Sequence, residues 1–297
     1  MKLKWAFLSL SFFVVTLLSG CNLLVLDPKG PQAERQAHDI ILSASIMLFI
    51  VITVFSLLIY MLIKYRASKQ SEDYEPPYIE GNKWVESIVI GIPVLIIVVL
   101  SIVSVRSNYI VESAPEGYEE EPLVVYASSS DWKWHFSYPE QDIETVNYLY
   151  IPTNRPLEFK LYSHGSITSF WIPQLGGQKY AMSDMVTTLH LAADEPGEYM
   201  GRNANFNGKG FAENTFNVKA MPQADFEDWV EEVKETAEPI TEDKFQELLE
   251  PGHLGQLTFN GTHLEFSPAP EGENGGHQHG NSEHDKNQHS SEEASEH

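Results

Sequence analysis

The sequence of 297 residues has one cysteine and few basic side chains. A single cysteine, Cys21, excludes an internal disulfide, a redox pair of cysteines, a cysteine-based zinc site and a thiolate-bridged metal cluster within the chain. Lysine and arginine number 19 against 42 aspartates and glutamates, so the formal net charge is −23. Because a nucleic-acid binder needs a basic surface to neutralise phosphates, this composition argues against nucleic acid as a partner.

Long apolar runs are confined to residues 1–20, 40–63 and 87–105. In the first run, a predominantly apolar stretch of 15 residues (5–19) follows a short basic start, and it is too short to span a bilayer comfortably. They lead into Leu18-Ser19-Gly20-Cys21, which resembles the bacterial lipobox. We therefore expect residues 1–20 to be a signal peptide and Cys21 to become the lipidated first residue of the mature chain. A plain signal peptide with a chance cysteine and a third transmembrane helix are the alternatives.

The two later runs are long enough to cross a membrane. Residues 40–63 form 24 uncharged residues, about 36 Å as a helix, and residues 87–105 form 19, about 28 Å. Basic residues occupy the connection and acidic residues follow the second run: Lys64, Arg66, Lys69 and Lys83, then Glu112, Glu116, Glu119, Glu120 and Glu121. The positive-inside rule places the connection in the cytoplasm. The prediction is an outer segment (21–39) and a transmembrane hairpin (40–107), with both ends on the outer face.

From residue 120 to residue 221 the sequence changes to short segments rich in Val, Tyr, Phe, Trp and Thr. Pro, Gly, Asn and Asp interrupt these segments, a pattern typical of an all-β sandwich or barrel. The predicted strands are residues 123–127, 132–138, 145–151, 157–162, 170–172 and 186–191.

Two helices are predicted in an extension, residues 222–267. Phe226, Trp229, Val230 and Val233 recur at helical spacing, and Thr241 is placed to cap the second helix. Residues 268–297 contain five histidines and almost no apolar residue, so a disordered tail is predicted. Loose metal binding by these histidines is the alternative.

Several motifs occur in the same order as in one known family. They are Leu26-Asp27-Pro28-Lys29-Gly30, Lys64-Tyr65-Arg66-Ala67, Asp131-Trp132-Lys133-Trp134, Tyr138-Pro139-Glu140-Gln141, Ser169-Phe170-Trp171-Ile172-Pro173, Tyr180-Ala181-Met182, Glu195-Pro196-Gly197 and Phe226-Glu227-Asp228-Trp229-Val230. With the lipobox and the two spans, the chain from Cys21 to Phe266 resembles subunit II of haem–copper terminal oxidases, in the quinol oxidase branch. The resemblance implies a membrane-anchored α+β fold, in which a transmembrane hairpin precedes a cupredoxin-like all-β sandwich and short C-terminal helices.

In cytochrome c oxidases of this family, the sandwich holds a binuclear copper centre. Two bridging thiolates are needed because soft sulfur suits the copper pair. Aligned on the motifs at 169–173 and 199–201, the ligand positions of this chain hold Thr168, Asn203, Asn205, Asn207, Phe211 and Asn214. The resemblance therefore implies no metal or cofactor in this chain and electron entry from a membrane quinol. Nearby His164 is expected to be a lone structural imidazole, and Trp132 and Trp134 to belong to the sandwich core.

The same resemblance implies a non-catalytic subunit of a proton-pumping quinol oxidase in the bacterial cell membrane. Haems and one copper are then expected in partner subunit I, with small subunits III and IV as further partners. Glu86 matches the family glutamate at the entrance of a proton-uptake path; an ordinary interfacial carboxylate at a helix start is the alternative. Two rival interpretations are subunit II of a cytochrome c oxidase, which requires cysteines at 203 and 207, and a stand-alone lipoprotein that binds a metal or a partner.

Overall fold

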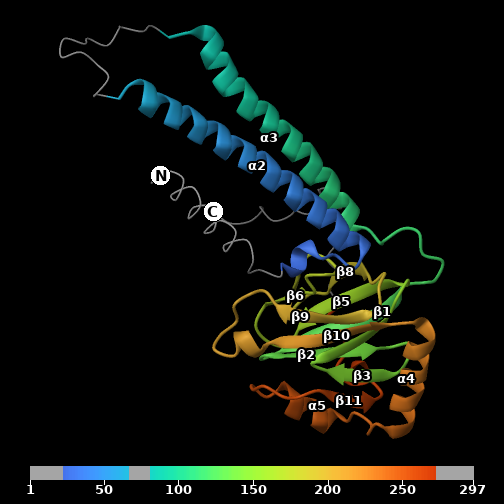
Figure 1. The fold of residues 1–297 in the computed structure, drawn as a ribbon. Coiled ribbons are helices and arrows are strands. Elements are labelled where there is room, and N and C mark those ends of the chain that lie inside the picture. Colours follow the sequence, from blue (N-terminus) through green and yellow to red (C-terminus); the bar gives the residue numbers. More distant parts are fainter. Residues whose placement is uncertain (1–22, 67–80, 272–297) are drawn as a thin grey trace, which may run out of the picture.

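The computed structural model describes residues 23–66 and 81–271 and places a two-helix hairpin at one end of a β-sandwich (Figure 1). The predicted signal peptide, the lipidation site Cys21, the connection at 67–80 and residues 272–297 of the predicted tail lie outside the described residues. The hairpin extends from one end of the sandwich, and the C-terminal helices lie towards the opposite end (Figure 1).

The hairpin consists of α2 (Pro31–Lys64) and α3 (Lys83–Glu112), preceded by the short helix η1 (Leu24–Leu26). Pro31 occupies the first position of α2, where its missing N–H costs nothing. Asn82 caps α3, because its side-chain oxygen accepts hydrogen bonds from the backbone N–H groups of Trp84 and Val85 at 3.0 and 3.4 Å. Both helices are long and apolar enough to cross a membrane, and they contain the predicted spans.

The sandwich is built from two sheets. The first has the order β11 (Leu257–Asn260), β3 (Ile143–Val146), β2 (Lys133–Tyr138), β1 (Leu123–Ser130), β5 (Pro156–Ser163) and β8 (Thr187–Ala192). The second has the order β4 (Tyr148–Pro152), β10 (Thr215–Met221), β9 (Gly197–Asn203), β6 (Thr168–Trp171) and β7 (Lys179–Ala181). The pairs β1–β5 and β4–β10 are parallel, and the remaining pairs are antiparallel.

The predicted strand at 145–151 is in fact two strands that belong to different sheets. Asn147 lies between β3 and β4 with a φ of 59°, a left-handed conformation that asparagine tolerates better than most residues. Its side-chain oxygen accepts a hydrogen bond from the backbone N–H of Trp134 at 3.0 Å, and its amide donates to the carbonyl of Leu254 at 2.8 Å. A single residue thus carries the chain from one sheet to the other.

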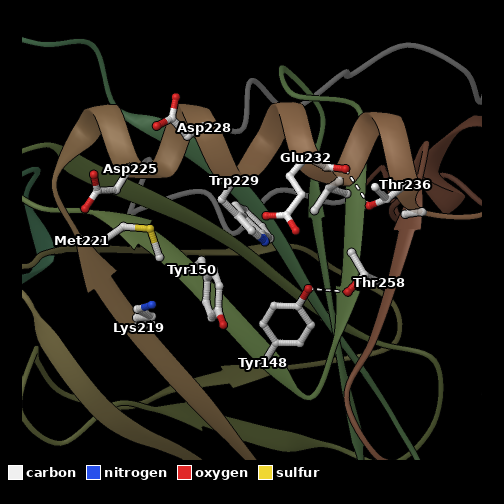
Figure 2. Close-up of a pocket in the computed structure, with 12 residues that line it drawn as sticks. Tyr148, Tyr150, Lys219, Met221, Asp225, Asp228, Trp229, Glu232, Thr236 and Thr258 are labelled. Atoms are coloured by element: carbon white, nitrogen blue, oxygen red, sulfur yellow. Dashed lines mark hydrogen bonds between the residues drawn. The ribbon is translucent and has the colours of Figure 1, made fainter.

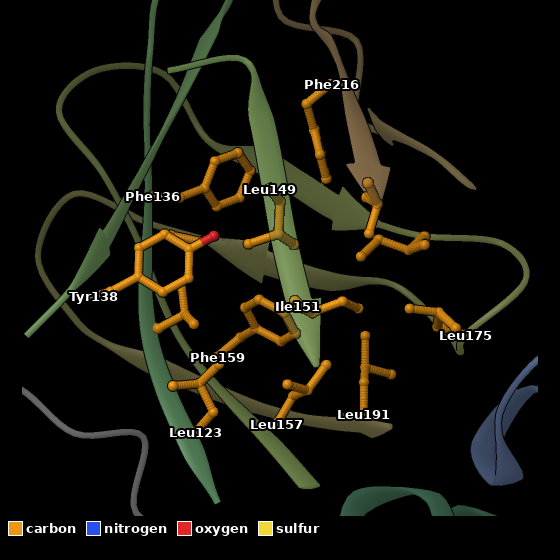
Figure 3. Packing of buried hydrophobic residues seen from close by; sticks show 14 of the residues in the cluster. Leu123, Phe136, Tyr138, Leu149, Ile151, Leu157, Phe159, Leu175, Leu191 and Phe216 are labelled. Carbon is orange, nitrogen blue, oxygen red and sulfur yellow. The ribbon is translucent and has the colours of Figure 1, made fainter. Parts of the chain in front are cut away.

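The core between the sheets is rich in aromatic rings (Figure 3). Trp134 and Phe136 of β2 meet Phe170 of β6 and Phe216 of β10, with ring centroids 5.0 to 6.5 Å apart. Burial of each such ring contributes about 1.5–3 kcal/mol. Gly201 of β9 leaves the space for Phe216, because a Cβ at this position would lie 2.0 Å from that ring.

The C-terminal extension contains the two predicted helices, α4 (Gln223–Thr236) and α5 (Glu242–Leu249). The Thr241 hydroxyl accepts a hydrogen bond from the Lys244 backbone N–H at 3.2 Å, which confirms the predicted cap. Two further elements were not predicted: β11, which pairs with β3, and the short helix η4 (His263–Glu265). The extension therefore completes the first sheet.

Residues 27–33, which we call the strap, tie the start of α2 to the sandwich. Lys29 donates its backbone N–H to Gln174 and accepts from the backbone N–H of Asp194, at 2.7 and 2.9 Å. Its ammonium also lies 2.9 Å from the Glu195 carboxylate. The strap runs so close to β8 that a Cβ on Gly30 would lie 2.0 Å from the carbonyl oxygen of Ala192. Only glycine fits at this contact.

Candidate functional site

The structure gathers the six positions aligned with copper ligands at one end of the five-stranded sheet. Thr168 begins β6, Asn203 ends β9, and the other four lie in the loop that leads through the short helix η3 (Phe211–Glu213) to β10. The Asn203 backbone N–H donates to the Asn214 carbonyl at 2.9 Å, which closes this loop. We call residues 203–214 the asparagine loop.

Hydrogen bonds within the protein occupy most of the polar side chains at these positions. The Asn203 side-chain oxygen accepts from the backbone N–H groups of Ser169 and Asn205 at 2.8 and 2.9 Å, while its amide donates to the Asn205 carbonyl at 2.8 Å. The Thr168 hydroxyl pairs with the Ser129 hydroxyl at 2.6 Å. The Asn203 side chain thus braces the loop through local hydrogen bonds to the backbone.

Asn214 behaves differently. It is fully buried, and neither atom of its side-chain amide has a hydrogen-bond partner among the described residues. The side-chain amide of Asn207 is likewise without a partner there. Such groups are uncommon in folded proteins, because an unmade buried hydrogen bond costs free energy.

Trp134 lies in the core, as expected, but the same expectation for Trp132 is wrong. Trp132 is half-buried in the turn between β1 and β2, with a φ of 67°. Its indole N–H points to the Asn207 carbonyl at 3.4 Å, and a Cβ on Gly210 would lie 2.1 Å from its ring. Trp132 therefore covers the asparagine loop instead of filling the core.

A second cluster of polar side chains, which the sequence did not predict, lies between the six-stranded sheet and the C-terminal extension. The His263 ring nitrogens lie 2.7 Å from a Glu144 carboxylate oxygen and 2.6 Å from the Tyr162 hydroxyl. The same carboxylate oxygen accepts from the His263 backbone N–H at 2.8 Å and from the Ser137 hydroxyl at 3.0 Å. Glu144 and His263 are fully buried.

His164 is not the lone imidazole that we expected. Its ring centroid lies 5.6 Å from that of His263 and 5.2 Å from that of Phe245 in α5. His135 also borders Phe245, and the His263 ring stacks on the Phe245 ring with centroids 4.2 Å apart. The three histidines thus surround one phenylalanine of the extension. Among the described residues, no group of three His, Cys, Asp or Glu side chains is placed to hold a metal ion.

Burial controls the charge of two of these histidines. Desolvation, reinforced by the neighbouring His263, lowers the pKa of His164 from 6.5 to about 4. Desolvation, with His263, His164 and Lys133 nearby, holds the pKa of His135 well below its usual value. Both side chains are therefore neutral in the folded protein at pH 7, whereas an unfolded chain would begin to protonate them near pH 6.5.

Stability is expected to fall as the pH is lowered from 6.5 towards 4, because in this window the unfolded chain binds protons that the folded chain excludes. Each histidine contributes a slope of about 1.4 kcal/mol per pH unit. Replacing His164 by glutamine should flatten the slope, whereas replacing the exposed His253 by glutamine should not. Chemical denaturation of the detergent-solubilised chain at a series of pH values measures both slopes. Equal slopes for the His164 variant and the unmodified chain would contradict the assignment.

Glu86 lies far from both clusters, in the first turn of α3 at the end of the hairpin remote from the sandwich (Figure 1). It is exposed and makes no ion pair within the described part of the chain. Its role in proton uptake stays a prediction.

Comparison with known proteins places this architecture in a family. The family described as "Cytochrome C oxidase subunit II, transmembrane domain" matches residues 21–106. The chain is 51% identical over 257 residues to quinol oxidase subunit 2 of Bacillus subtilis (strain 168), covering 85% of this chain and 80% of that one. It is 44% identical over 273 residues to quinol oxidase subunit 2 of Bacillus anthracis, covering 90% and 94%.

Among solved structures, the periplasmic domain of subunit II of cytochrome oxidase from Bradyrhizobium japonicum is 19% identical. That match covers 40% of this chain and 98% of the other, with a TM-score of 0.38.

An apolar hairpin, a two-sheet sandwich and short C-terminal helices together define a membrane protein of the oxidase subunit II type. The chain belongs to the quinol oxidase subunit 2 family. It is thus subunit II of a terminal oxidase and a component of a complex with partner subunits such as subunit I. The predicted family and fold class are confirmed.

Proposed function

We propose that this chain is the non-catalytic subunit II of an oxidase that takes electrons from a membrane quinol, reduces oxygen to water and pumps protons. One observation carries the choice of donor: the six aligned positions present hydroxyl, amide and phenyl groups. A binuclear copper centre needs soft thiolate ligands, so these residues do not fit it. The Asn203 side chain instead makes its hydrogen bonds with the backbone of Ser169 and Asn205. Electrons then enter through subunit I, which would hold the haems and one copper.

The proposed arrangement gives each part of the chain a mechanical task. The hairpin braces subunit I within the bilayer, with small subunits III and IV completing the complex. The sandwich caps the outer face, because the basic connection stays in the cytoplasm. A lipid on Cys21 would give the chain a second membrane anchor in addition to the hairpin. Relatives named quinol oxidase subunit 2 support the quinol as electron donor.

Oxygen uptake by the detergent-purified complex tests the donor. The complex is supplied in turn with a reduced quinol analogue and with reduced cytochrome c, and its copper content is measured beside its haem content. Uptake with quinol alone, with no copper beyond the single ion expected in subunit I, is the expected result. Uptake with cytochrome c, or a further pair of copper ions, would overturn the proposal.

Replacing Glu86 by glutamine is expected to slow quinol-driven oxygen uptake several-fold while haem content and assembly stay unchanged. A carboxylate at a cytoplasmic helix start exchanges protons rapidly with water, and glutamine keeps its size without this ability. Glu116→Gln, on the outer side of α3, is the matched control. Wild-type turnover in the Glu86 variant would assign Glu86 to an interfacial role.

A further inference from the structure

A groove of about 710 Å³ runs beneath α4, on a flank of the sandwich away from the hairpin (Figures 1 and 2). Strands β4, β10 and β11 form its floor and α4 forms its wall. It lies outside the asparagine loop and the histidine cluster, and neither the family nor the proposed function assigns it a task. Its size is within the range of small-molecule sites.

Aromatic rings of the floor and of the adjoining wall line the groove. Trp229 of α4 meets Tyr150 of β4 with ring centroids 4.9 Å apart, and Tyr148 lies 5.0 Å from Tyr150 and 6.4 Å from Trp229. Figure 2 shows these three rings together between the helix and the strands. The electron-rich faces of Trp and Tyr attract organic cations, so the floor favours a positively charged ligand.

One ammonium group of the protein already contacts an aromatic ring of this floor. The Lys219 Nζ lies 5.5 Å from the centroid of the Tyr150 ring, within the range of a cation–π contact. The pair shows that the groove accommodates a primary ammonium over an aromatic face. Lys219 is exposed and occupies one end of the groove (Figure 2).

The wall is acidic. Asp225, Asp228 and Glu232 line the groove from α4, and none of them forms an ion pair within residues 23–66 and 81–271. Three carboxylates against the one ammonium of Lys219 leave the groove negative. From Asp225 to Glu232 the helix rises about 10 Å, so the negative charge is distributed along the groove rather than gathered at one point.

We propose that this groove binds alkylammonium cations, with amino groups over the rings of Tyr150 and Trp229 and further amino groups beside the carboxylates of α4. The aromatic floor and the spread of the acids favour a flexible chain with two or more amino groups. A bare metal ion would need oxygen ligands that converge on one point. Free polyamines and the lysine side chains of a protein segment share this chemistry.

Calorimetric titration of the detergent-solubilised full chain tests the proposal, with spermidine and a trilysine peptide as separate probes. Glu232→Gln should weaken binding up to about fivefold, because an exposed carboxylate beside the ligand is lost. Lys219→Gln should tighten binding several-fold, because it removes the resident cation. Glu235→Gln, another exposed acid of α4, is the matched control and should change nothing.

Saturable binding of either probe with this pattern of variants supports the site. Spermidine alone would identify a free polyamine as the ligand, and trilysine alone would identify a protein segment. Absence of saturable binding by both would overturn the proposal. Equal losses in Glu232→Gln and Glu235→Gln, with no gain in Lys219→Gln, would also overturn it, since they would indicate diffuse attraction to an acidic surface.

Discussion

Replacing Glu144 by alanine is expected to lower the free energy of unfolding by about 3 kcal/mol or more, because several buried donors lose their acceptor at about 1–3 kcal/mol each. A single carboxylate oxygen of Glu144 accepts hydrogen bonds from the Ser137 hydroxyl and the His263 backbone, and it lies 2.7 Å from the His263 ring. All three groups are fully buried, so water cannot replace the lost acceptor. Chemical denaturation of the detergent-solubilised chain measures the loss.

The same change should loosen the attachment of the C-terminal extension to the six-stranded sheet. His263 joins the extension to the sheet, so limited proteolysis should cut after residue 250 more readily in the Glu144→Ala variant. Glu144→Gln keeps an oxygen acceptor and should recover part of the stability. Glu265→Ala, an exposed acid of η4, is the control and should cost less than about 0.5 kcal/mol. A Glu144→Ala variant as stable as this control would mean that the cluster contributes nothing to holding the extension.

Replacing Gly30 by alanine is expected to detach the strap from the sandwich, at a cost of about 3 kcal/mol or more. The added Cβ would lie 2.0 Å from the Ala192 carbonyl oxygen, and backbone atoms cannot swing aside as a side chain can. Moving the strap away also breaks the backbone hydrogen bonds of Lys29 with Gln174 and Asp194.

Zero-length carbodiimide coupling reports on the strap directly. In the unmodified chain the Lys29 ammonium lies 2.9 Å from the Glu195 carboxylate, so the two should couple, and peptide mapping should recover the cross-link. The Gly30→Ala variant should lose most of the product. Gly91→Ala is the control, because a Cβ there meets nothing within 4 Å. Undiminished coupling in the Gly30 variant would show that the strap tolerates a side chain.

The hairpin and most of the first sheet could be predicted because their signals are local. Two long uncharged runs suffice for α2 and α3, and β-branched and aromatic residues between turn formers mark β1, β2 and β5. This residue pattern does not reveal a strand that is short or rich in Gly and Asn. Thus β9 carries Gly197, Gly201 and Asn203, and β11 has only four residues in an extension where only helices were predicted.

The histidine cluster could not be predicted for a different reason. His135 lies in β2, His164 directly follows β5 and His263 begins η4, with no regular spacing between them. They meet only because β11 returns to pair with β3 and brings η4 beside the sheet. The groove beneath α4 likewise needs β4 and β11, which lie far from β10 and α4 in the sequence. The six aligned positions, by contrast, could be located from a motif, because they lie in one loop and one neighbouring strand.

Because α2 is a single continuous helix, its length determines how the sandwich is oriented in the complex. The helix begins within the strap and continues to Lys64 without interruption. The sandwich is therefore connected to the membrane-spanning segment by one continuous helix. Each residue of an α-helix turns by about 100° and rises 1.5 Å. Inserting one residue in the first turns of α2 would therefore rotate the sandwich by about 100° and shift it by about 1.5 Å relative to the membrane-spanning part of the helix. The length of α2 therefore sets both the orientation of the sandwich and its distance from the membrane-spanning segment.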